Sequence, residues 1–390
     1  MKIAGVLWDN LFKAGGREVF TLNLFSRFAE MGHDVTLYVP EREGRKRKAL
    51  YESLPFEVRF FPRWQKLSFT RFPSLLGRWL NLEQQRHRFD VWQAMGAYPE
   101  AFLASYVSCP STVRFYGEDI QICQELNYGI RLDLKSAARI RSSLPSLAGI
   151  VAMTPSLAKD AEAMGAHRDR IELIPNAIDF PRLQSTSDAE LRHRNNIGEN
   201  ETVFLTVGRN HPKKGYDLIP EIAARLKGRG WKWVVVGDRG DGILDELEQK
   251  GLAEQFRFIP ELKNDDHEIS QGRSQMPPQA LIDWFVSSDV MVLPSRLEGF
   301  SRVIAESMGA GLPVVTTDAP GCGEVLENGV HGLVAPKDDV DKLAERMNAL
   351  LDSSELRFSL GESARQYANG MDWPTVAGRY LAHYEKLRTW

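Results

Sequence analysis

The sequence predicts an α/β protein built from two doubly wound, Rossmann-like domains. Short apolar runs alternate with longer amphipathic segments such as Arg17–Met31, which is typical of parallel sheets with helices on both faces. Runs such as Trp233–Val236 are apolar throughout, as expected of strands buried on both sides of a sheet. The alternation starts again near Thr202, and a chain of 390 residues suits two cores better than one.

The strand candidates form two series on either side of a polar linker, Gln184–Glu201. We therefore expect an N-terminal domain over residues 1–183, a C-terminal domain over residues 184–370 and a closing segment over residues 371–390. Ligands of doubly wound sheets bind beyond the carboxyl ends of the strands, so we expect the domains to face each other across a binding cleft. The candidates are Lys2–Trp8, Asp34–Val39, Phe56–Phe61, Thr112–Phe115, Gly149–Met153 and Ile171–Ile174, then Thr202–Val207, Lys232–Val236, Arg257–Ile259, Val290–Leu293, Val314–Thr317 and Gly332–Val334.

Composition narrows the classes of function. The net charge of −3 disfavours a protein that binds nucleic acid with its whole surface. Three cysteines, Cys109, Cys123 and Cys322, and eight histidines show no metal-ligand spacing, so we expect reduced thiols and no metal site. Met1 leads directly into an apolar strand, and no transmembrane segment is visible, so we expect a cytoplasmic protein.

The segment Pro294–Val314 combines a strand, a turn at Gly299 and a helix. The start of a helix offers unpaired N–H groups and partial positive charge, so the amides of Phe300 and Ser301 are candidates for binding a phosphate. Glu306 follows five residues later, roughly 7–8 Å along the axis, a reach suited to a ribose on the same diphosphate. Glu298, just before the helix, can accept hydrogen bonds from sugar hydroxyls.

Two further turns carry residues suited to phosphate. Arg209 and Lys214 follow the strand Thr202–Val207, and fixed cations there can stabilise a departing diphosphate without a metal. Gly15 and Gly16 follow the first strand and allow the backbone to approach a phosphate closely. The alternatives are a basic surface loop for the first turn and an ordinary glycine turn for the second.

Together these segments resemble family 4 of the retaining glycosyltransferases, which have the GT-B fold. The resemblance covers most of the chain and is carried by Gly15-Gly16, Pro175–Asp179, Gly208-Arg209 with Lys214-Gly215, Glu298 with Glu306, Gly311–Val315, Gly321–Glu324 and Asn328–Pro336. It implies that the last helix, Trp373–Leu387, crosses back to the first domain. It also implies transfer with retention of configuration through a front-face step in which the leaving phosphate takes the acceptor's proton, with no metal and no cofactor.

The family resemblance assigns a role to each site candidate. Arg209 and Lys214 would bind the donor diphosphate, and Glu306 the ribose of the nucleotide. Glu298, Gly299 and the amides of Phe300 and Ser301 would hold the sugar and the distal phosphate, and Gly15 and Gly16 would approach from the first domain. UDP is the first expectation for the nucleotide and GDP the second, with a glycan or a lipid-linked acceptor in envelope polysaccharide or glycolipid synthesis.

Tyr116 departs from the family pattern, because many members have a histidine there. We expect its hydroxyl to point into the cleft and to bind the donor sugar or the acceptor, while packing in the domain wall is the alternative. Glu118 and Asp119 beside it suit the acceptor side, and a capping or surface role is the alternative. The departure leaves open a catalytically inactive binding partner, and the shared diphosphate site leaves open a sugar-nucleotide epimerase or hydrolase.

Two segments interrupt the alternation of strands and helices. Residues 41–90 contain 12 Lys and Arg against 6 Asp and Glu, so we expect this segment to contact an anionic membrane at the inner face of the plasma membrane. The alternative is a solvated helix whose aromatic residues face the core. Residues 263–274 are expected to form a polar insertion before a helix at Ala280–Val286. The aromatic residues of the first segment are Phe56, Phe60, Phe61, Trp64, Phe69, Phe72 and Trp79.

We predict that activity survives EDTA, because fixed cations such as Arg209 and Lys214 would carry the phosphate charge that a metal carries elsewhere. The rate of nucleotide release from a nucleotide sugar, measured with and without the chelator, checks this. Loss of activity with EDTA, restored by a divalent cation, would reject the metal-free mechanism.

Overall fold

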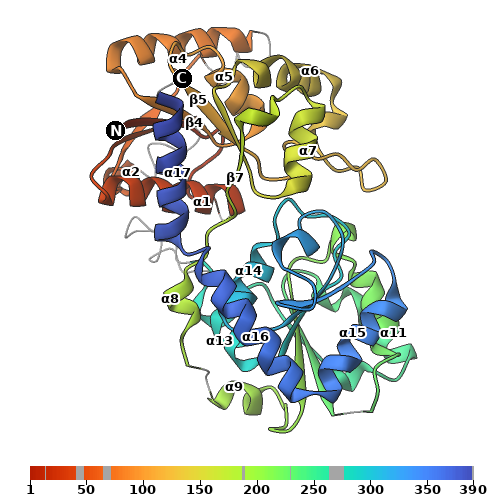
Figure 1. Cartoon of the computed structure of the whole chain (residues 1–390). Helices are drawn as coiled ribbons and strands as arrows, with labels where there is room; N and C mark the ends of the chain where they lie inside the picture. Colours follow the sequence, from red (N-terminus) through yellow and green to blue (C-terminus); the bar gives the residue numbers. More distant parts are fainter. Residues whose placement is uncertain are drawn as a thin grey trace. The chain divides into compact units, whose positions relative to one another are not determined.

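The computed structural model describes residues 1–13, 15–40, 48–64, 72–186, 189–228, 230–262 and 276–388. The chain divides into two compact units (Figure 1), which are Met1–Pro175 with Pro374–Trp390 and Asn176–Lys263 with Pro277–Trp373. Each unit contains one parallel sheet with helices on both faces, so the predicted fold class is confirmed. The segment 263–274, where we expected a polar insertion, lies outside the described residues.

Over the described residues, the first unit has a seven-stranded sheet in the order β3-β2-β1-β4-β5-β6-β7, with every neighbouring pair parallel. The order reverses between β1 and β4, which makes the carboxyl ends of these strands a topological switch point. The strands are β1 (Lys2–Val6), β2 (Asp34–Val39), β3 (Glu57–Phe60), β4 (Val91–Ala94), β5 (Ser111–Arg114), β6 (Gly149–Ala152) and β7 (Ile171–Leu173). The α-helices are α1 (Gly16–Glu30), α2 (Lys48–Glu52), α4 (Pro73–His87), α5 (Phe102–Ala104), α6 (Leu134–Ser143), α7 (Pro155–Ala163) and α17 (Trp373–Arg388).

The sequence analysis missed β4, although this strand lies in the centre of the sheet. The strand is only four residues long, and the polar Gln93 interrupts its apolar run. Gln93 is fully buried, and its side-chain oxygen accepts a hydrogen bond of 2.8 Å from the Tyr384 hydroxyl of α17. A polar residue is stable there because a side chain from the other end of the sequence pairs with it.

Helix α17 docks on the first sheet through three buried polar contacts. Tyr384 binds Gln93 of β4, His383 Nε2 lies 3.0 Å from the Thr112 hydroxyl of β5, and Arg114 Nη1 donates to the Tyr380 hydroxyl at 2.8 Å. Figure 1 shows this last helix of the chain lying with the N-terminal strands, as the family resemblance implied. The three pairs specify both the position and the rotation of the helix on the sheet.

The opposite face of the first sheet packs against α4 and α5. Leu76 and Leu80 of α4 join Phe61, Trp92 and Leu103 in one buried cluster. Among the aromatic residues of segment 41–90, Phe56 and Phe61 are buried, and the Trp79 ring lies 5.6 Å from that of Phe61. For these three residues the core alternative was correct, whereas Trp64 and Phe72 are exposed.

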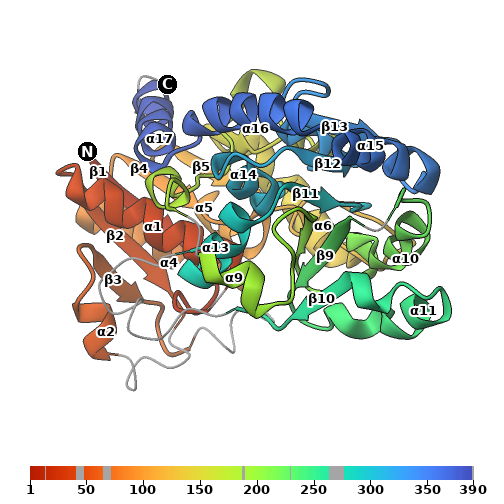
Figure 2. The ribbon, with the colours of Figure 1, turned by 90° about the horizontal axis from the view of Figure 1, so that it is seen from below.

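The second unit has, in its described part, a six-stranded parallel sheet in the order β10-β9-β8-β11-β12-β13. Figure 2 shows α10 and α15 on one side of this sheet and α13 and α14 on the other. The order reverses between β8 and β11, so a second switch point lies there. The strands are β8 (Thr202–Val207), β9 (Trp231–Val236), β10 (Phe256–Ile259), β11 (Val290–Leu293), β12 (Val314–Thr317) and β13 (Gly332–Ala335). The α-helices are α8 (Phe180–Leu183), α9 (Ala189–Arg194), α10 (Ile219–Ala223), α11 (Leu244–Gln249), α13 (Gln279–Ser287), α14 (Arg302–Gly309), α15 (Val340–Asp352) and α16 (Ser354–Asn369).

The second unit begins at Asn176, where we expected residue 184. The Ile178 amide donates to the Met371 carbonyl at 3.0 Å, and the Leu183 side chain packs against Gly309 of α14. These contacts hold α8 to the second unit before the polar linker is reached. The linker itself contains the short helix α9.

We predict that Tyr384→Phe lowers the free energy of unfolding of the first unit by about 1–2 kcal/mol, because it leaves the buried oxygen of Gln93 without its donor. Tyr367→Phe is the matched control, since Tyr367 is 48% exposed. It is expected to change stability by less than about 0.5 kcal/mol. Urea unfolding monitored by circular dichroism measures both, and equal effects would contradict this view of the α17 interface.

Candidate functional site

Two loops of the second unit meet at the switch point of its sheet. One loop follows β8 and carries Arg209 and Lys214, and the other follows β11 and carries Glu298. Gly215 has a φ of +67°, and a Cβ there would lie 2.1 Å from the Pro294 carbonyl oxygen. Gly321 has a φ of +70°, and a Cβ there would lie 2.2 Å from the Glu298 carbonyl oxygen. Only glycine allows these close approaches. The one at Gly215 joins the loops after β8 and β11, and the one at Gly321 joins the loop after β12 to the loop after β11.

A buried ion pair joins the two loops. Glu298 is 6% exposed, and one of its carboxylate oxygens contacts Lys214 Nζ while the other lies 3.5 Å from Lys213 Nζ. The Ser295 hydroxyl lies 3.4 Å from the oxygen that Lys214 contacts. Burial by itself would raise the pKa of Glu298, but the two ammonium groups lower it below its ordinary value. The site therefore contains an ionised carboxylate between two cations.

The N-terminus of α14 differs from the sequence prediction at Ser301. The Ser301 amide donates to the Gly321 carbonyl at 2.9 Å, so it is not available to a phosphate. The Ser301 side chain does not cap the helix, and its buried hydroxyl has no hydrogen-bond partner among the described residues. The first amides inside the helix, those of Arg302 and Val303, are the ones that helix geometry leaves without an internal acceptor. The Ser301 amide is thus excluded from the expected phosphate-binding role, that of the Phe300 amide stays a prediction, and the amides of Arg302 and Val303 become further candidates.

Glu306 is buried on the second turn of α14 and is paired within the helix. Arg302 Nη2 donates to its carboxylate at 2.8 Å. Burial raises the pKa of Glu306, and the nearby Arg302 and Arg182 oppose this only in part. Sequence reasoning missed Arg302, which the i, i+4 spacing to Glu306 could have revealed.

Arg209 and Gly299 complete the predicted residues of the second unit. Arg209 is exposed, and within the described residues no hydrogen bond or ion pair engages its guanidinium. Gly299 is buried in the turn before α14, beside Gly321. Arg209 is therefore the predicted cation whose side chain has no competing partner in the part of the chain that the structure describes.

Gly15 and Gly16 lie in the first unit, at the start of α1. Gly15 is the N-cap residue, and the Glu18 carboxylate folds back over it, so that a Cβ at Gly15 would lie 2.0 Å from that carboxylate. The start of α1 thus already has an anion beside it. Arg17 Nε lies 3.2 Å from the Glu18 carboxylate, and Arg17 Nη1 lies 3.1 Å from that of Glu100.

The expected orientation of Tyr116 is wrong. Its hydroxyl oxygen is buried and makes no hydrogen bond of ordinary geometry to any described residue, although the Thr21 hydroxyl lies near it. The ring packs 6.3 Å from that of Phe20, and the Arg114 guanidinium lies 4.8 Å from its centroid. Residues 114 and 116 lie two positions apart and point to the same side, where α1 and α17 cover them. Burial raises the pKa of the Tyr116 hydroxyl, which agrees with a packing role.

Asp119 has the capping role that the sequence analysis gave as an alternative for it. Its carboxylate accepts hydrogen bonds from the amides of Tyr116 and Gly117 at 2.8 and 3.0 Å, and from the Ala97 amide at 3.0 Å. These bonds hold the turns after β4 and β5 together. Glu118 is exposed and has no such role.

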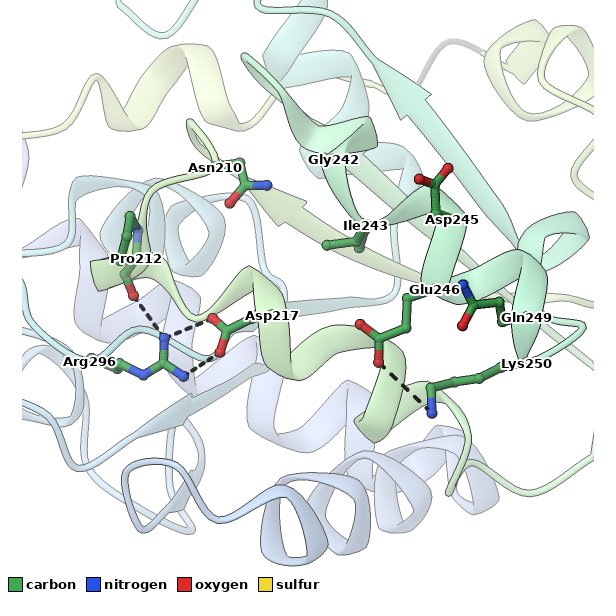
Figure 3. A pocket seen from close by; sticks show the side chains of 10 residues that line it. All are labelled: Asn210, Pro212, Asp217, Gly242, Ile243, Asp245, Glu246, Gln249, Lys250 and Arg296. Atoms are coloured by element: carbon green, nitrogen blue, oxygen red, sulfur yellow. Dashed lines mark hydrogen bonds and ion pairs between the residues drawn. The ribbon is translucent and has the colours of Figure 1, made fainter.

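Two hollows in the second unit lie outside the predicted residues. One, of about 1000 Å³, opens between the loop after β8 and α11 (Figure 3), where Arg296 forms a double hydrogen bond with Asp217 and Lys250 faces Glu246. The other, of about 240 Å³, lies at the carboxyl ends of β9 and β10 and is lined by residues of Gly237–Asp241 and Phe258–Glu261. The second hollow follows the strand next to β8 and so lies on the ligand-binding edge of the sheet.

The described residues contain no group of three or more His, Cys, Asp or Glu side chains arranged to hold a metal ion. Metal independence stays a prediction. No helix in the described part of the chain is both long enough and apolar enough to span a membrane.

The chain matches two protein-family models that lie end to end along it. The model described as Glycosyltransferase Family 4 matches residues 14–182, and the model described as Glycosyl transferases group 1 matches residues 187–367. The two matches meet at the polar linker between the two strand series.

Curated relatives are similar over part of their length. The chain is 27% identical to the D-inositol 3-phosphate glycosyltransferase of Nocardia farcinica, over 57% of this chain and 49% of that protein. It is 29% identical to the protein of the same name from Kribbella flavida, over 56% of this chain and 52% of that protein. The chain thus spans about half the length of the curated relatives it matches.

Solved structures share the whole fold. Anabaena Alr3699/HepE in complex with UDP superposes with a TM-score of 0.79 at 18% identity, over 99% of this chain and 100% of that chain. WaaG, a glycosyltransferase involved in lipopolysaccharide biosynthesis, superposes with a TM-score of 0.68 at 19% identity, over 99% of both chains. At these identities the likeness shows the fold alone, which agrees with the predicted GT-B architecture.

We predict that Lys214→Met lowers the free energy of unfolding of the second unit by about 3 kcal/mol at pH 7, because it weakens the compensation of the buried Glu298 charge. Lys213→Met removes the more distant partner, and is the matched control with an expected cost of about 1 kcal/mol. Urea unfolding of both variants measures the difference.

The same measurement at lower pH tests the charge on Glu298. Because its folded-state pKa is lowered, the ionised form adds stability above the unfolded pKa of about 4.3, and this stability is lost as the pH falls through the folded value. The difference in free energy of unfolding between wild type and Lys214→Met should therefore decrease as the pH falls from 7 toward about 4 and below. A gap that stays constant would show that Glu298 is not ionised.

Proposed function

The chain belongs to the family 4, group 1 glycosyltransferases, and from this premise we propose that it transfers a sugar from a nucleotide-diphosphate sugar to an acceptor hydroxyl. The observation that carries the proposal is the Lys214–Glu298 pair at the switch point, beside the N-terminus of α14. It combines cations, the amides of an uncapped helix N-terminus and a carboxylate within two adjoining loops. A diphosphate and a sugar need these three kinds of group.

The diphosphate would lie between the loop after β8 and the start of α14. Arg209 offers a guanidinium fork that no described residue engages, and Lys214 supplies a compact charge. The amides of Arg302 and Val303 would donate to the phosphate oxygens at the positive end of the helix. As the leaving diphosphate gains charge, these fixed groups stabilise it more strongly than they stabilise the bound donor.

The sugar and the nucleoside would extend to either side of the diphosphate. Glu298 would accept hydrogen bonds from the sugar hydroxyls, and Lys213 and Lys214 keep it in the ionised, accepting form. Glu306 would accept from the ribose hydroxyls, with Arg302 holding its carboxylate in place. The hollow at the ends of β9 and β10 is the proposed place for the base. The complexes of Alr3699/HepE with UDP and UDP-glucose support UDP as the first choice over GDP.

Transfer is proposed to retain the configuration of the anomeric carbon. The bond from this carbon to the leaving phosphate oxygen breaks, and the bond to the acceptor oxygen forms on the same face. The acceptor's proton passes to the leaving phosphate oxygen, so the protein need not supply a separate base. This agrees with the burial of the Tyr116 hydroxyl, which makes it unsuited to act as one.

The acceptor is proposed to be a glycan or a lipid-linked molecule of the cell envelope, reached from the cytoplasmic side. WaaG, which shares the fold, is named for lipopolysaccharide biosynthesis. The curated relatives are named for an inositol phosphate acceptor, which is a third class to include in any screen.

We predict that Arg209→Gln and Glu306→Gln each weaken binding of the preferred UDP-sugar about 30-fold or more, which corresponds to about 2–4 kcal/mol. Arg209 is exposed, so its replacement leaves folding unchanged. Arg225→Gln and Glu345→Gln are matched controls, because both residues form surface pairs elsewhere in the same unit. Isothermal titration measures the affinities, and unchanged binding in both site variants would show that the donor site lies elsewhere.

The reaction class is tested with a panel of nucleotide sugars, followed by nucleotide release with and without acceptors. Release that requires an acceptor supports transfer. Release without any acceptor would identify a hydrolase, and interconversion of the sugar without release an epimerase. Donor binding without any turnover would identify an inactive binding partner.

A further inference from the structure

Helix α4 has an unusual outer face. Its inner face, with Leu76 and Leu80, packs into the core of the first unit, as Figure 1 shows for its place beside α5. At 100° per residue, positions 75, 78, 82 and 86 fall together on the opposite side. The outer face, with Phe72 at the N-cap, consists of Phe72, Leu75, Arg78, Leu82 and Arg86, and all five residues are exposed.

The apolar members of this face are far more exposed than leucine and phenylalanine usually are. Phe72 is 60%, Leu75 45% and Leu82 57% exposed. They alternate with arginines rather than with carboxylates. A patch of this kind marks a surface that contacts another molecule. The charge of the patch indicates that the other molecule carries the opposite charge.

The charge of the outer face is positive. Between positions 72 and 88 the only acidic residue is Glu83, which points inward and is 5% exposed. Its carboxylate accepts from the Tyr38 hydroxyl at 3.1 Å and pairs with Arg59 and Arg86. Arg78 and the C-cap residue Arg88 are exposed as well, so the face presents cations and apolar side chains without an exposed carboxylate.

We propose that the outer face of α4 is the surface by which this protein docks on an anionic lipid bilayer. Phe72, Leu75 and Leu82 enter the boundary between headgroups and acyl chains, while Arg78 binds a lipid phosphate at the rim. Arg86 lies beside it, and its exposed guanidinium adds to the binding although one of its nitrogens already pairs with Glu83. This narrows the broad segment 41–90 to one helix face and excludes Phe56, Phe61 and Trp79, which belong to the core. The proposal does not depend on the sugar-transfer activity.

A second copy of the chain fits this face poorly. A symmetric contact would set the arginines of one helix against those of its partner. The surface area that five side chains can bury is also smaller than the area of about 800 Å² per partner that a stable dimer buries. An anionic bilayer has neither difficulty. Its phosphates carry the charge opposite to that of the arginines, and three separate apolar side chains can insert among its acyl chains.

Vesicle flotation of the full chain tests the proposal. Wild type should float with phosphatidylcholine vesicles that contain about one-third phosphatidylglycerol, and should float less at high salt or without the anionic lipid. Leu75→Ser/Leu82→Ser should weaken binding at least ten-fold. Arg78→Glu changes the charge by two units and should weaken it about 25-fold, from about five-fold per charge.

Matched control variants distinguish binding through this face from nonspecific binding to vesicles. Leu134→Ser/Phe358→Ser removes two apolar side chains that are 83% and 76% exposed elsewhere, and Arg168→Glu reverses an exposed arginine of the same unit. Both should bind vesicles as wild type does. The proposal fails if wild type does not float with anionic vesicles, or if the controls lose binding as much as the α4 variants. It also fails if Leu75→Ser/Leu82→Ser instead abolishes a dimer seen by sedimentation, which would assign the face to self-association.

Discussion

The second unit depends on the contact between Lys214 and Glu298. The two residues follow different strands, and their ion pair ties the β8 and β11 loops together where the sheet order reverses. A carboxylate that is 6% exposed is stable as an anion only beside compensating cations. The close approach at Gly215 serves the same end, because it holds the two loops against each other, while the one at Gly321 holds the β11 loop against the loop after β12. If the chain has the proposed function, the bound diphosphate competes with Glu298 for Lys214. The Glu298 carboxylate can then accept hydrogen bonds from the sugar hydroxyls.

The two units use their polar groups differently. In the first unit, Arg17 is engaged by Glu18 and Glu100, and Asp119 is saturated by backbone amides. In the second, Arg209 projects without a partner among the described residues, and the first amides of α14 are uncapped. The paired groups of the first unit hold loops in place, whereas the second unit adds to its own pairs a cation and helix-terminal amides that can bind a charged ligand. This difference supports the second unit as the donor-binding one.

Most strands could be predicted, since a strand buried in a parallel sheet needs an apolar run that is visible in the sequence. The exception, β4, contains Gln93, whose hydrogen-bond partner Tyr384 comes from the last helix. The glycines and charges at the second switch point could also be predicted, because a strand, a turn and a helix are local patterns. The sequence could not show which amides near the start of α14 are available as donors. The Ser301 amide donates to the Gly321 carbonyl, which belongs to another loop.

The sequence by itself determined the two doubly wound units, the position of the candidate site after β8 and β11, and the residue types that this candidate site contains. These follow from periodicity and from short motifs, whose physical causes act over a few neighbouring residues. Only the tertiary structure decided that Tyr116 turns inward, that Lys213 joins Lys214 on Glu298, and which side of α4 stays exposed. Burial and charge pairing depend on elements that meet only in the folded chain, so no local pattern contains them.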